Sequence, residues 1–233
     1  MKLFCIPHAG ASAISYNIWK EYLDQKIHLI PLDLPGHMTR SSEPLSENIN
    51  DVVYDLAQNI KKNILSNETY AVYGHSMGGL LLYLLYFYLK DQGEPLPIHL
   101  FFSSRWPPYY HNEKAYYNLD DLEECKSRII RMGGFKQEVL NNTALTEYYM
   151  NILLADYRLM QSVSIKEIKQ INSDITVLWS DNEPDIIDKD IYTWRESAGN
   201  NISFVKIKGT HFFPTEEPLK TTNIINYTLK KYS

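Results

Sequence analysis

Short apolar segments alternate with segments of helical periodicity along most of this chain. The apolar segments are rich in Ile, Leu, Val and aromatic residues, which indicates β-strands. The predicted strands are residues 3–7, 27–32, 69–75, 98–103, 175–179 and 202–207. Helical spacing of apolar residues predicts helices over residues 51–65, 77–90 and 216–231. This alternation is typical of an α/β fold, with a mostly parallel sheet and helices on both faces.

One long segment, residues 107–171, interrupts this alternation. It contains no convincing strand pattern, but apolar residues recur at helical spacing. The clearest helix begins near Thr143, a plausible N-cap, and continues to Tyr157. We therefore predict a single domain over residues 1–233, with residues 107–171 inserted as a helical lid over the carboxyl ends of the strands. Extra helices packed on one face of the sheet are the alternative.

Composition narrows the class of protein. Hydrophobic residues make up 44% and charged residues 22%, which is ordinary for a globular protein. The formal net charge is −5 and no Lys/Arg-rich run exists, so we expect no nucleic-acid partner. No apolar stretch reaches the ~18 residues of a membrane span, and the N-terminus lacks a signal-peptide core. We therefore expect a cytoplasmic protein with no membrane partner.

The cysteines offer no cross-link or metal site. Cys5 and Cys125 are the two cysteines, and they lie far apart in the sequence. Two distant cysteines do not make a disulfide framework, and no spacing typical of metal ligands is present. We predict neither a metal nor a diffusible cofactor.

The sequence G-H-S-M-G-G at residues 74–79 joins a predicted strand to a predicted helix. Glycines two residues to either side of Ser76 allow a sharp turn, because side chains there would collide with the neighbouring strand and helix. A serine at the tip of a strand, turn and helix is typical of the nucleophile elbow of α/β-hydrolases. We therefore predict the α/β-hydrolase fold, with Ser76 as the nucleophile. A glycine-rich turn that serves only packing is the alternative.

A serine nucleophile needs a histidine base and an acid that orients the histidine. In α/β-hydrolases the chain order is Ser, then Asp or Glu, then His. His211 fits this order, because it follows the last predicted strand and precedes the closing helix. Four other histidines suit structural positions better, because they precede the serine or lie beside or within strands: His8, His37, His75 and His99. His8 is also placed to line the site.

Three carboxylates compete for the role of the acid. The loop after strand 175–179 reads S-D-N-E-P-D and contains Asp181, Glu183 and Asp185. Many hydrolases have a G-x-x-D-P sequence here, which aligns Glu183 with the acid and Pro184 with the proline. Either carboxylate type can accept from the imidazole Nδ1–H, although glutamate is one methylene longer. We predict Glu183, with Asp181 and Asp185 as alternatives.

A tetrahedral intermediate needs two backbone N–H donors. The residue after the nucleophile, Met77, should supply one. The other should come from the loop after the first strand, residues 7–12, where small side chains allow close approach of the backbone to a substrate. We predict Ala9 as the second donor, with Gly10 as the alternative.

Together these segments resemble type II thioesterases, the separate α/β-hydrolases that accompany nonribosomal peptide and polyketide synthases. The resemblance covers nearly the whole chain. It rests on F-C-I-P-H-A-G at 4–10, L-P-G-H at 34–37, G-H-S-M-G-G at 74–79, S-R-W-P-P at 104–108, G-G at 133–134, A-D-Y at 155–157 and H-F-F at 211–213. The chain departs from the family pattern at Ala11 and Thr210, which replace glycines, and at Glu183, where aspartate is usual.

The resemblance implies a substrate class. Such enzymes hydrolyse thioesters on the phosphopantetheine arm of carrier-protein domains and so remove misprimed acyl or aminoacyl groups. It further implies that this chain acts as a monomer without a cofactor. Carrier proteins are usually acidic and this chain is acidic too, so we expect weak, transient binding through local contacts. The alternatives are release of fatty-acyl chains from a fatty-acid synthase, a small-molecule carboxylesterase, and an inactive hydrolase fold that serves as a scaffold.

Overall fold

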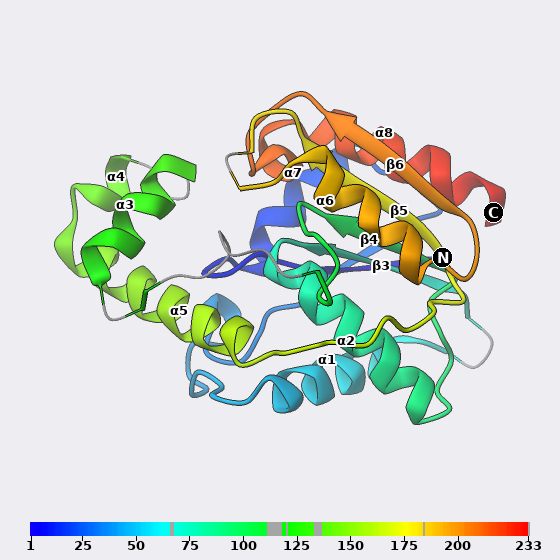
Figure 1. Cartoon of the computed structure of the whole chain (residues 1–233), viewed down its shortest axis with the longest axis horizontal. Helices are drawn as coiled ribbons and strands as arrows, with labels where there is room; N and C mark the ends of the chain where they lie inside the picture. Colours follow the sequence, from blue (N-terminus) through cyan, green and yellow to red (C-terminus); the bar gives the residue numbers. More distant parts are fainter. Residues whose placement is uncertain (66–67, 111–117, 120, 133–136, 184, 233) are drawn as a thin grey trace.

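Six parallel strands form the central sheet of the protein (Figure 1). The computed structural model describes residues 1–65, 68–110, 118–119, 121–132, 137–183 and 185–232. The strands are β1 (Lys2–Ile6), β2 (His28–Pro31), β3 (Tyr70–His75), β4 (His99–Ser103), β5 (Asp174–Ser180) and β6 (Ile202–Ile207). They lie in the order β2-β1-β3-β4-β5-β6, and each neighbouring pair is parallel. Each strand predicted from the sequence is present, and the predicted α/β-hydrolase architecture is confirmed.

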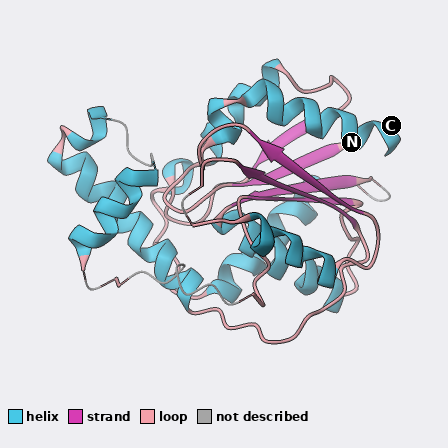
Figure 2. Cartoon of the chain, turned by 45° about the horizontal axis from the view of Figure 1, so that its top comes forward, coloured by secondary structure: helices cyan, strands magenta, loops and turns pink. Residues whose placement is uncertain are grey.

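Helices cover both faces of the sheet (Figure 2). The α-helices are α1 (Ile49–Asn63), α2 (Met77–Asp91), α3 (Leu122–Met132), α4 (Gln137–Leu140), α5 (Thr143–Gln161), α6 (Asp188–Tyr192), α7 (Phe213–Glu216) and α8 (Pro218–Leu229). The 3-10 helices are η1 (Ala13–Glu21), η2 (Met38–Arg40), η4 (Thr193–Ser197) and η5 (Lys230–Tyr232). Figure 1 shows α1 and α2 on one side of the sheet and α8 on the other.

Alternate residues of each central strand contribute to different cores. In β1, Phe4 packs with the apolar residues of α1 and α2, whereas Leu3 packs with η1 and α8. Both residues are fully buried. A parallel strand covered on both faces is apolar at successive positions, which explains why these strands appear in the sequence as unbroken apolar runs.

The closing helix differs from its prediction. The sequence pattern predicts one helix over residues 216–231, whereas the structure has α7 and α8 with Glu217 between them at φ −123° and ψ 54°. Pro218 explains the break, because a proline disfavours helical geometry in the residue before it and cannot donate a backbone hydrogen bond. Pro218 instead occupies the first turn of α8, where its missing N–H has no consequence.

The segment between β4 and β5 contains α3, α4 and α5, which we call the helical insertion. Both views show α3 and α4 lying beside the main body of the protein, with α5 leading back toward it (Figures 1 and 2). The N-cap of α5 is Asn142 rather than the predicted Thr143, because the Asn142 side chain accepts a hydrogen bond from the backbone N–H of Leu145. The G-G motif at residues 133–134 lies outside the described residues.

Three predictions from the sequence concern membrane spans, the two cysteines and metal ligands. Within the described residues, no helix combines the length and apolar character needed to cross a bilayer. Cys5 and Cys125 are both buried and are not joined by a disulfide. The described part of the chain contains no group of three or more His, Cys, Asp or Glu side chains arranged to hold a metal ion.

Candidate active site

Ser76 lies at the sharp turn between β3 and α2. Its backbone has φ 54° and ψ −111°, a conformation that a residue with a side chain rarely adopts. A Cβ atom on Gly74 would lie 2.2 Å from the carbonyl oxygen of Gly78, and one on Gly78 would lie 2.2 Å from the carbonyl oxygen of Ile6. Both glycines are therefore sterically required by the close packing of this turn, whose strained backbone is typical of functional sites.

The hydroxyl of Ser76 does not cap α2, although Ser76 stands at the N-terminus of this helix. Ser76 is the N-cap of α2, but its side chain makes no capping hydrogen bond. Its backbone N–H donates to the carbonyl oxygen of Ser103 at the end of β4, at 2.8 Å. Met77 is the first residue of α2 and is fully buried. The positive end of the α2 dipole therefore lies beside the hydroxyl, where it favours negative charge.

His211 lies in the loop between β6 and α7, and its Nδ1 atom is 2.7 Å from Oε2 of Glu183. The two side chains are 8% and 2% exposed, so water has little access to this contact. A carboxylate can only accept, which assigns the proton to Nδ1 and leaves Nε2 with a lone pair. The ring of His211 is also packed against the ring of His75, with a centroid distance of 4.9 Å. The imidazole is thus held in the tautomer that a general base requires.

The structure brings Glu183, rather than Asp181, to the histidine. The carboxylate of Asp181 instead accepts a hydrogen bond from the backbone N–H of Gly209, at 3.0 Å, and so ties together the loops after β5 and β6. Asp185 is half-buried on the same loop as Glu183. Pro184 lies outside the described residues. Of the three predicted carboxylates, Glu183 is the one whose described contacts include His211.

The loop after β1 contains the predicted second N–H donor. Ala9 is buried, and the next residue, Gly10, has φ 74°. The N–H of Gly10 donates to Oδ2 of Asp156 in α5, at 2.7 Å. Because the N–H of Gly10 already donates to Asp156, Ala9 remains the candidate donor from this loop.

Asp156 is a buried carboxylate that the sequence indicated only through the A-D-Y motif. Besides Gly10, its Oδ2 atom contacts Nε2 of His37 at 3.0 Å, and the two side chains are 1% and 4% exposed. Burial by itself would lower the pKa of His37, but the hydrogen bond and the charge of Asp156 outweigh burial and raise this pKa. His37, predicted to be structural, thus belongs to a buried pair that contacts the loop after β1.

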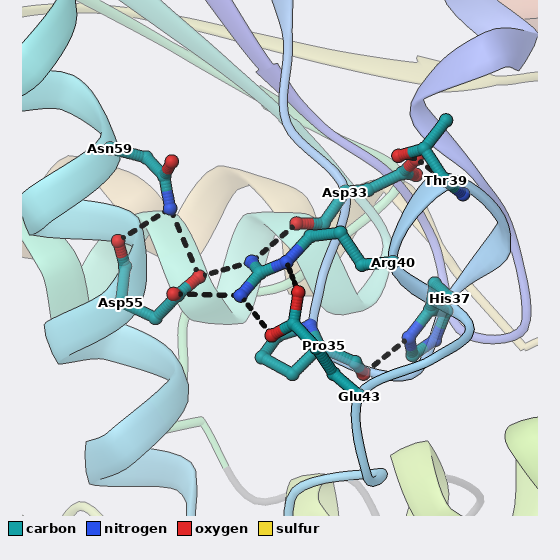
Figure 3. Close-up of polar contacts among 8 residues, drawn as sticks. All are labelled: Asp33, Pro35, His37, Thr39, Arg40, Glu43, Asp55 and Asn59. Carbon is teal, nitrogen blue, oxygen red and sulfur yellow. Dashed lines mark hydrogen bonds and ion pairs between the residues drawn. The ribbon is translucent and has the colours of Figure 1, made fainter.

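Arg40 organises the loop that carries His37 (Figure 3). Its guanidinium contacts both carboxylate oxygens of Asp55 in α1, at 2.6 and 3.0 Å, and both oxygens of Glu43, at 2.7 and 2.6 Å. It also donates to the carbonyl oxygen of Asp33, at 3.1 Å. Paired two-point contacts of this kind restrict orientation as well as distance. The loop between β2 and α1 is therefore held at several points.

Two further histidines, His8 and His75, lie near His211. Burial, and next the charge of His211, lower the pKa of His8 to about 3. The same two causes lower the pKa of His75 well below its usual range. The His8 ring lies 5.5 Å from the ring of His75 and 5.0 Å from that of Phe212, between centroids. Both rings are therefore neutral at pH 7, so they pack around the candidate base without adding charge that would compete with it.

The fold, the strained serine and the paired histidine and carboxylate define a serine hydrolase of the α/β-hydrolase class. The thioesterase domain family model matches residues 1–231. The chain therefore belongs to the thioesterase family and is a hydrolase of thioesters. The resemblance inferred from the sequence motifs is confirmed.

Similar proteins of known sequence and structure agree with this assignment. The chain is 28% identical to the gramicidin S biosynthesis protein GrsT of Aneurinibacillus migulanus, covering 91% of this chain and 82% of that protein. It is 25% identical to the medium-chain S-acyl fatty acid synthase thioesterase of Homo sapiens, covering 98% and 86%. Among solved structures, ClbQ from the colibactin NRPS/PKS pathway superposes with a TM-score of 0.90 at 27% identity, covering 99% of this chain and 97% of that one.

Proposed function

We propose that this thioesterase hydrolyses acyl or aminoacyl thioesters on the phosphopantetheine arm of carrier proteins, and so removes misprimed groups from nonribosomal peptide or polyketide synthases. Ser76 is the nucleophile, His211 the base and Glu183 the acid. The observation that carries the proposal is the 2.7 Å contact between His211 Nδ1 and Glu183 Oε2, at the same end of the sheet as the strained turn of Ser76. The likeness to GrsT and to ClbQ supports the choice of substrate.

Acylation begins when Ser76 Oγ attacks the thioester carbonyl carbon and His211 Nε2 takes the hydroxyl proton. The negative charge that develops on the carbonyl oxygen is stabilised by the backbone N–H groups of Met77 and Ala9, with the N-terminus of α2 behind them. Glu183 stabilises the imidazolium that forms. The carbon–sulfur bond then breaks, and the pantetheine thiol leaves with the proton from His211.

Deacylation repeats the same steps with water. His211 Nε2 takes a proton from a water molecule, which attacks the acyl-serine carbonyl carbon. The same two N–H groups stabilise the second tetrahedral intermediate. The carboxylic acid is released when the bond to Ser76 Oγ breaks and His211 returns the proton to the serine. None of these steps uses a metal ion or a diffusible cofactor.

We further propose that residues 1–233 form one domain in which the helical insertion acts as a lid. The support is the contact between α5 and the loop of the second N–H donor. Besides the Asp156 hydrogen bond, Leu153 of α5 packs on Gly10 so closely that a Cβ there would lie 2.9 Å from Leu153 Cδ1. An insertion that contacts this loop can cover the bound acyl group and exclude water.

A carrier-protein substrate implies weak and transient docking. Because this chain carries a formal charge of −5 and carrier proteins are acidic, long-range attraction does not favour the complex. Local contacts around the phosphopantetheine arm must therefore supply the affinity. We propose that the enzyme acts as a monomer in the cytoplasm.

The test uses carrier proteins loaded with acetyl, aminoacyl or dodecanoyl groups on the phosphopantetheine arm. Release is followed by intact-protein mass spectrometry for the wild type and Ser76→Ala, with an oxygen ester as the control substrate. Fast release of acetyl or aminoacyl groups that depends on Ser76 would support the proposal. Good ester cleavage without release from any loaded carrier would contradict it and favour a general carboxylesterase.

Release of fatty-acyl chains from a fatty-acid synthase is the second candidate function. It is favoured by the likeness to medium-chain S-acyl fatty acid synthase thioesterases from Anas platyrhynchos, at 26% identity, and Homo sapiens, at 25% identity. A strong preference for the dodecanoyl carrier over the acetyl carrier would identify this activity.

A further inference from the structure

Ser104, the residue after β4, makes a contact that the mechanism above leaves unused. Its hydroxyl donates a hydrogen bond to Oε1 of Glu183 at 2.6 Å. The residue is 2% exposed, and its backbone adopts φ 50°, in the left-handed region. A left-handed conformation is unfavourable for a residue other than glycine, and such strain concentrates at functional sites. The backbone N–H of Ser104 is held by the carbonyl oxygen of Leu178 in β5, at 2.8 Å.

The two oxygens of the Glu183 carboxylate have separate partners. Oε2 faces His211, whereas Oε1 accepts from the hydroxyl of Ser104 and, at 2.9 Å, from the backbone N–H of Ser180. Ser180 ends the strand that leads into the loop of Glu183, so its contact is local. Ser104 directly follows a different strand, β4, and its backbone N–H bonds to β5, so its hydroxyl ties the carboxylate to the body of the sheet.

The end of β4 contacts the nucleophile as well as the acid. The carbonyl oxygen of Ser103 accepts the backbone N–H of Ser76, at 2.8 Å, and the next residue, Ser104, donates to Glu183. Two adjacent residues thus connect the two ends of the proposed triad. A glutamate has one more rotatable bond than an aspartate, so its carboxylate needs an additional contact to keep one orientation.

We propose that Ser104 is a positioning residue, which orients the Glu183 carboxylate and through it the ring of His211. This inference rests on the proposed triad. Ser104 touches no reacting atom. Its O–H holds Oε1 so that Oε2 stays directed at Nδ1 of His211 while the imidazole gains and loses the proton at Nε2. Without the hydroxyl, the carboxylate can rotate away and His211 loses its alignment with Ser76.

The first experiment compares Ser104→Ala with Ser104→Gly. Both variants lack the hydroxyl, and glycine also adopts φ 50° without strain. We expect each to lower kcat for thioester hydrolysis by about tenfold or more, with KM little changed, because a hydrogen bond to a charged group is lost. Ser173→Ala is the matched control. Its hydroxyl donates at the same 2.6 Å to the carbonyl oxygen of Pro97, at the other end of the sheet, and its loss should leave kcat unchanged.

A double-mutant cycle separates positioning from a purely structural role. If Ser104 acts through Glu183, adding Ser104→Ala to Glu183→Ala should change the residual kcat by less than about twofold. The proposal would be overturned if Ser104→Ala lowered kcat as strongly in the Glu183→Ala variant as it does in the wild type. The proposal would also be overturned if the single variants Ser104→Ala and Ser104→Gly kept kcat within about twofold of the wild type. Melting temperatures are measured alongside, and the Ser104→Gly variant keeps the test valid if Ser104→Ala folds poorly.

A second readout makes this inference independent of the carrier-protein substrate. The rate at which a fluorophosphonate probe labels Ser76 depends on the histidine base but not on a carrier protein. If the wild type labels at Ser76 yet releases no acyl group from any carrier, the proposed substrate fails, and Ser104 is still tested by labelling. Labelling that slows about tenfold in both Ser104 variants, but not in Ser173→Ala, supports the proposal. Equal labelling rates in all variants contradict it.

Discussion

The Oδ2 atom of Asp156 in α5 lies 2.7 Å from the backbone nitrogen of Gly10 in the loop after β1. This buried hydrogen bond joins the helical insertion to the loop that carries the candidate N–H donor Ala9. The same carboxylate contacts His37, so three segments that are remote in the sequence meet at one side chain. Movement of α5 away from the sheet would have to break this bond or carry the loop with it.

The His37–Asp156 pair predicts a component of stability that decreases as the pH rises. The pKa of His37 is raised in the folded protein because the hydrogen bond and charge of Asp156 outweigh burial. Protonated His37 therefore stabilises the fold fully below its unfolded pKa of about 6.5, and this contribution disappears as the pH rises through the folded pKa. In urea denaturation, the stability difference between the wild type and His37→Gln should be largest near pH 5.5 and decrease toward pH 9.

The control for this prediction is His28→Gln, which changes an exposed histidine in β2. Its unfolding free energy is measured over the same pH range and gives the effect of replacing an exposed histidine. A difference between the wild type and His37→Gln that grows with pH would contradict the assigned direction.

The proposed role of Glu183 as the triad acid predicts that replacing Glu183 and replacing its neighbour Asp181 affect kcat very differently. Glu183→Gln removes the charge that faces His211 Nδ1 and allows the wrong tautomer, so kcat should fall by about a thousandfold. Asp181→Asn keeps an oxygen that can accept from Gly209 N–H, so its kcat should stay within about threefold of the wild type. Steady-state hydrolysis of a thioester measures both. Comparable losses in the two variants would remove the reason for choosing Glu183.

Buried neutral histidines predict a loss of stability in acid. Burial, and next the charge of Lys231, lower the pKa of His99 to about 4, and its Nε2 atom lies 2.8 Å from Thr176 Oγ1. Between about pH 6.5 and pH 4 the unfolded chain binds a proton here that the folded protein does not, so stability falls as the pH falls.

We expect His99→Gln to reduce this slope by up to about 1.4 kcal/mol per pH unit, measured as unfolding free energy from urea titrations between pH 6.5 and 4. The unfolding free energy of His99→Gln should still fall with falling pH, because His8 and His75 remain. Burial lowers the pKa of each, that of His8 to about 3. An unchanged slope in His99→Gln would show that His99 is already protonated in the folded protein.

The steric role of the elbow glycines predicts a severe effect of one methyl group. In Gly78→Ala the new Cβ would lie 2.2 Å from the carbonyl oxygen of Ile6, a backbone atom that cannot move aside. We expect destabilisation of about 4 kcal/mol or more, or no folded protein. Gly93→Ala is the control, because nothing lies within 4 Å of a Cβ there and the positive φ of 68° adds only about 1–2 kcal/mol. Circular dichroism and thermal melts distinguish the two.

Much of the fold could be predicted from local patterns. The six strands, the helices α1 and α2 and the turn at Ser76 all follow from the spacing of apolar residues and from the position of glycines. These features depend on contacts between residues a few positions apart, or on burial against any apolar partner, so the pattern along the chain contains the information. The break before Pro218 also had a local signal, because proline restricts the preceding residue.

The details of the site required the tertiary structure. Asp181, Glu183 and Asp185 lie within one short loop, and the sequence favoured Glu183 but kept Asp181 and Asp185 as alternatives. The structure directs Glu183 at His211, and it gives Asp181 a different partner. The direction of a side chain on a loop depends on which remote segments pack against that loop, and local spacing does not record this.

The same reason explains the contacts that the sequence left unassigned. Gly10 and Asp156 are 146 positions apart, and Ser104 and Glu183 are 79 positions apart. The sequence by itself determined the class of fold, the nucleophile elbow and the late histidine, because each depends on residues close together in the chain or on the order of motifs along it. Only the tertiary structure decided which carboxylate faces the histidine, and which buried hydrogen bonds hold it there, because these pairs form when distant segments meet at the ends of the strands.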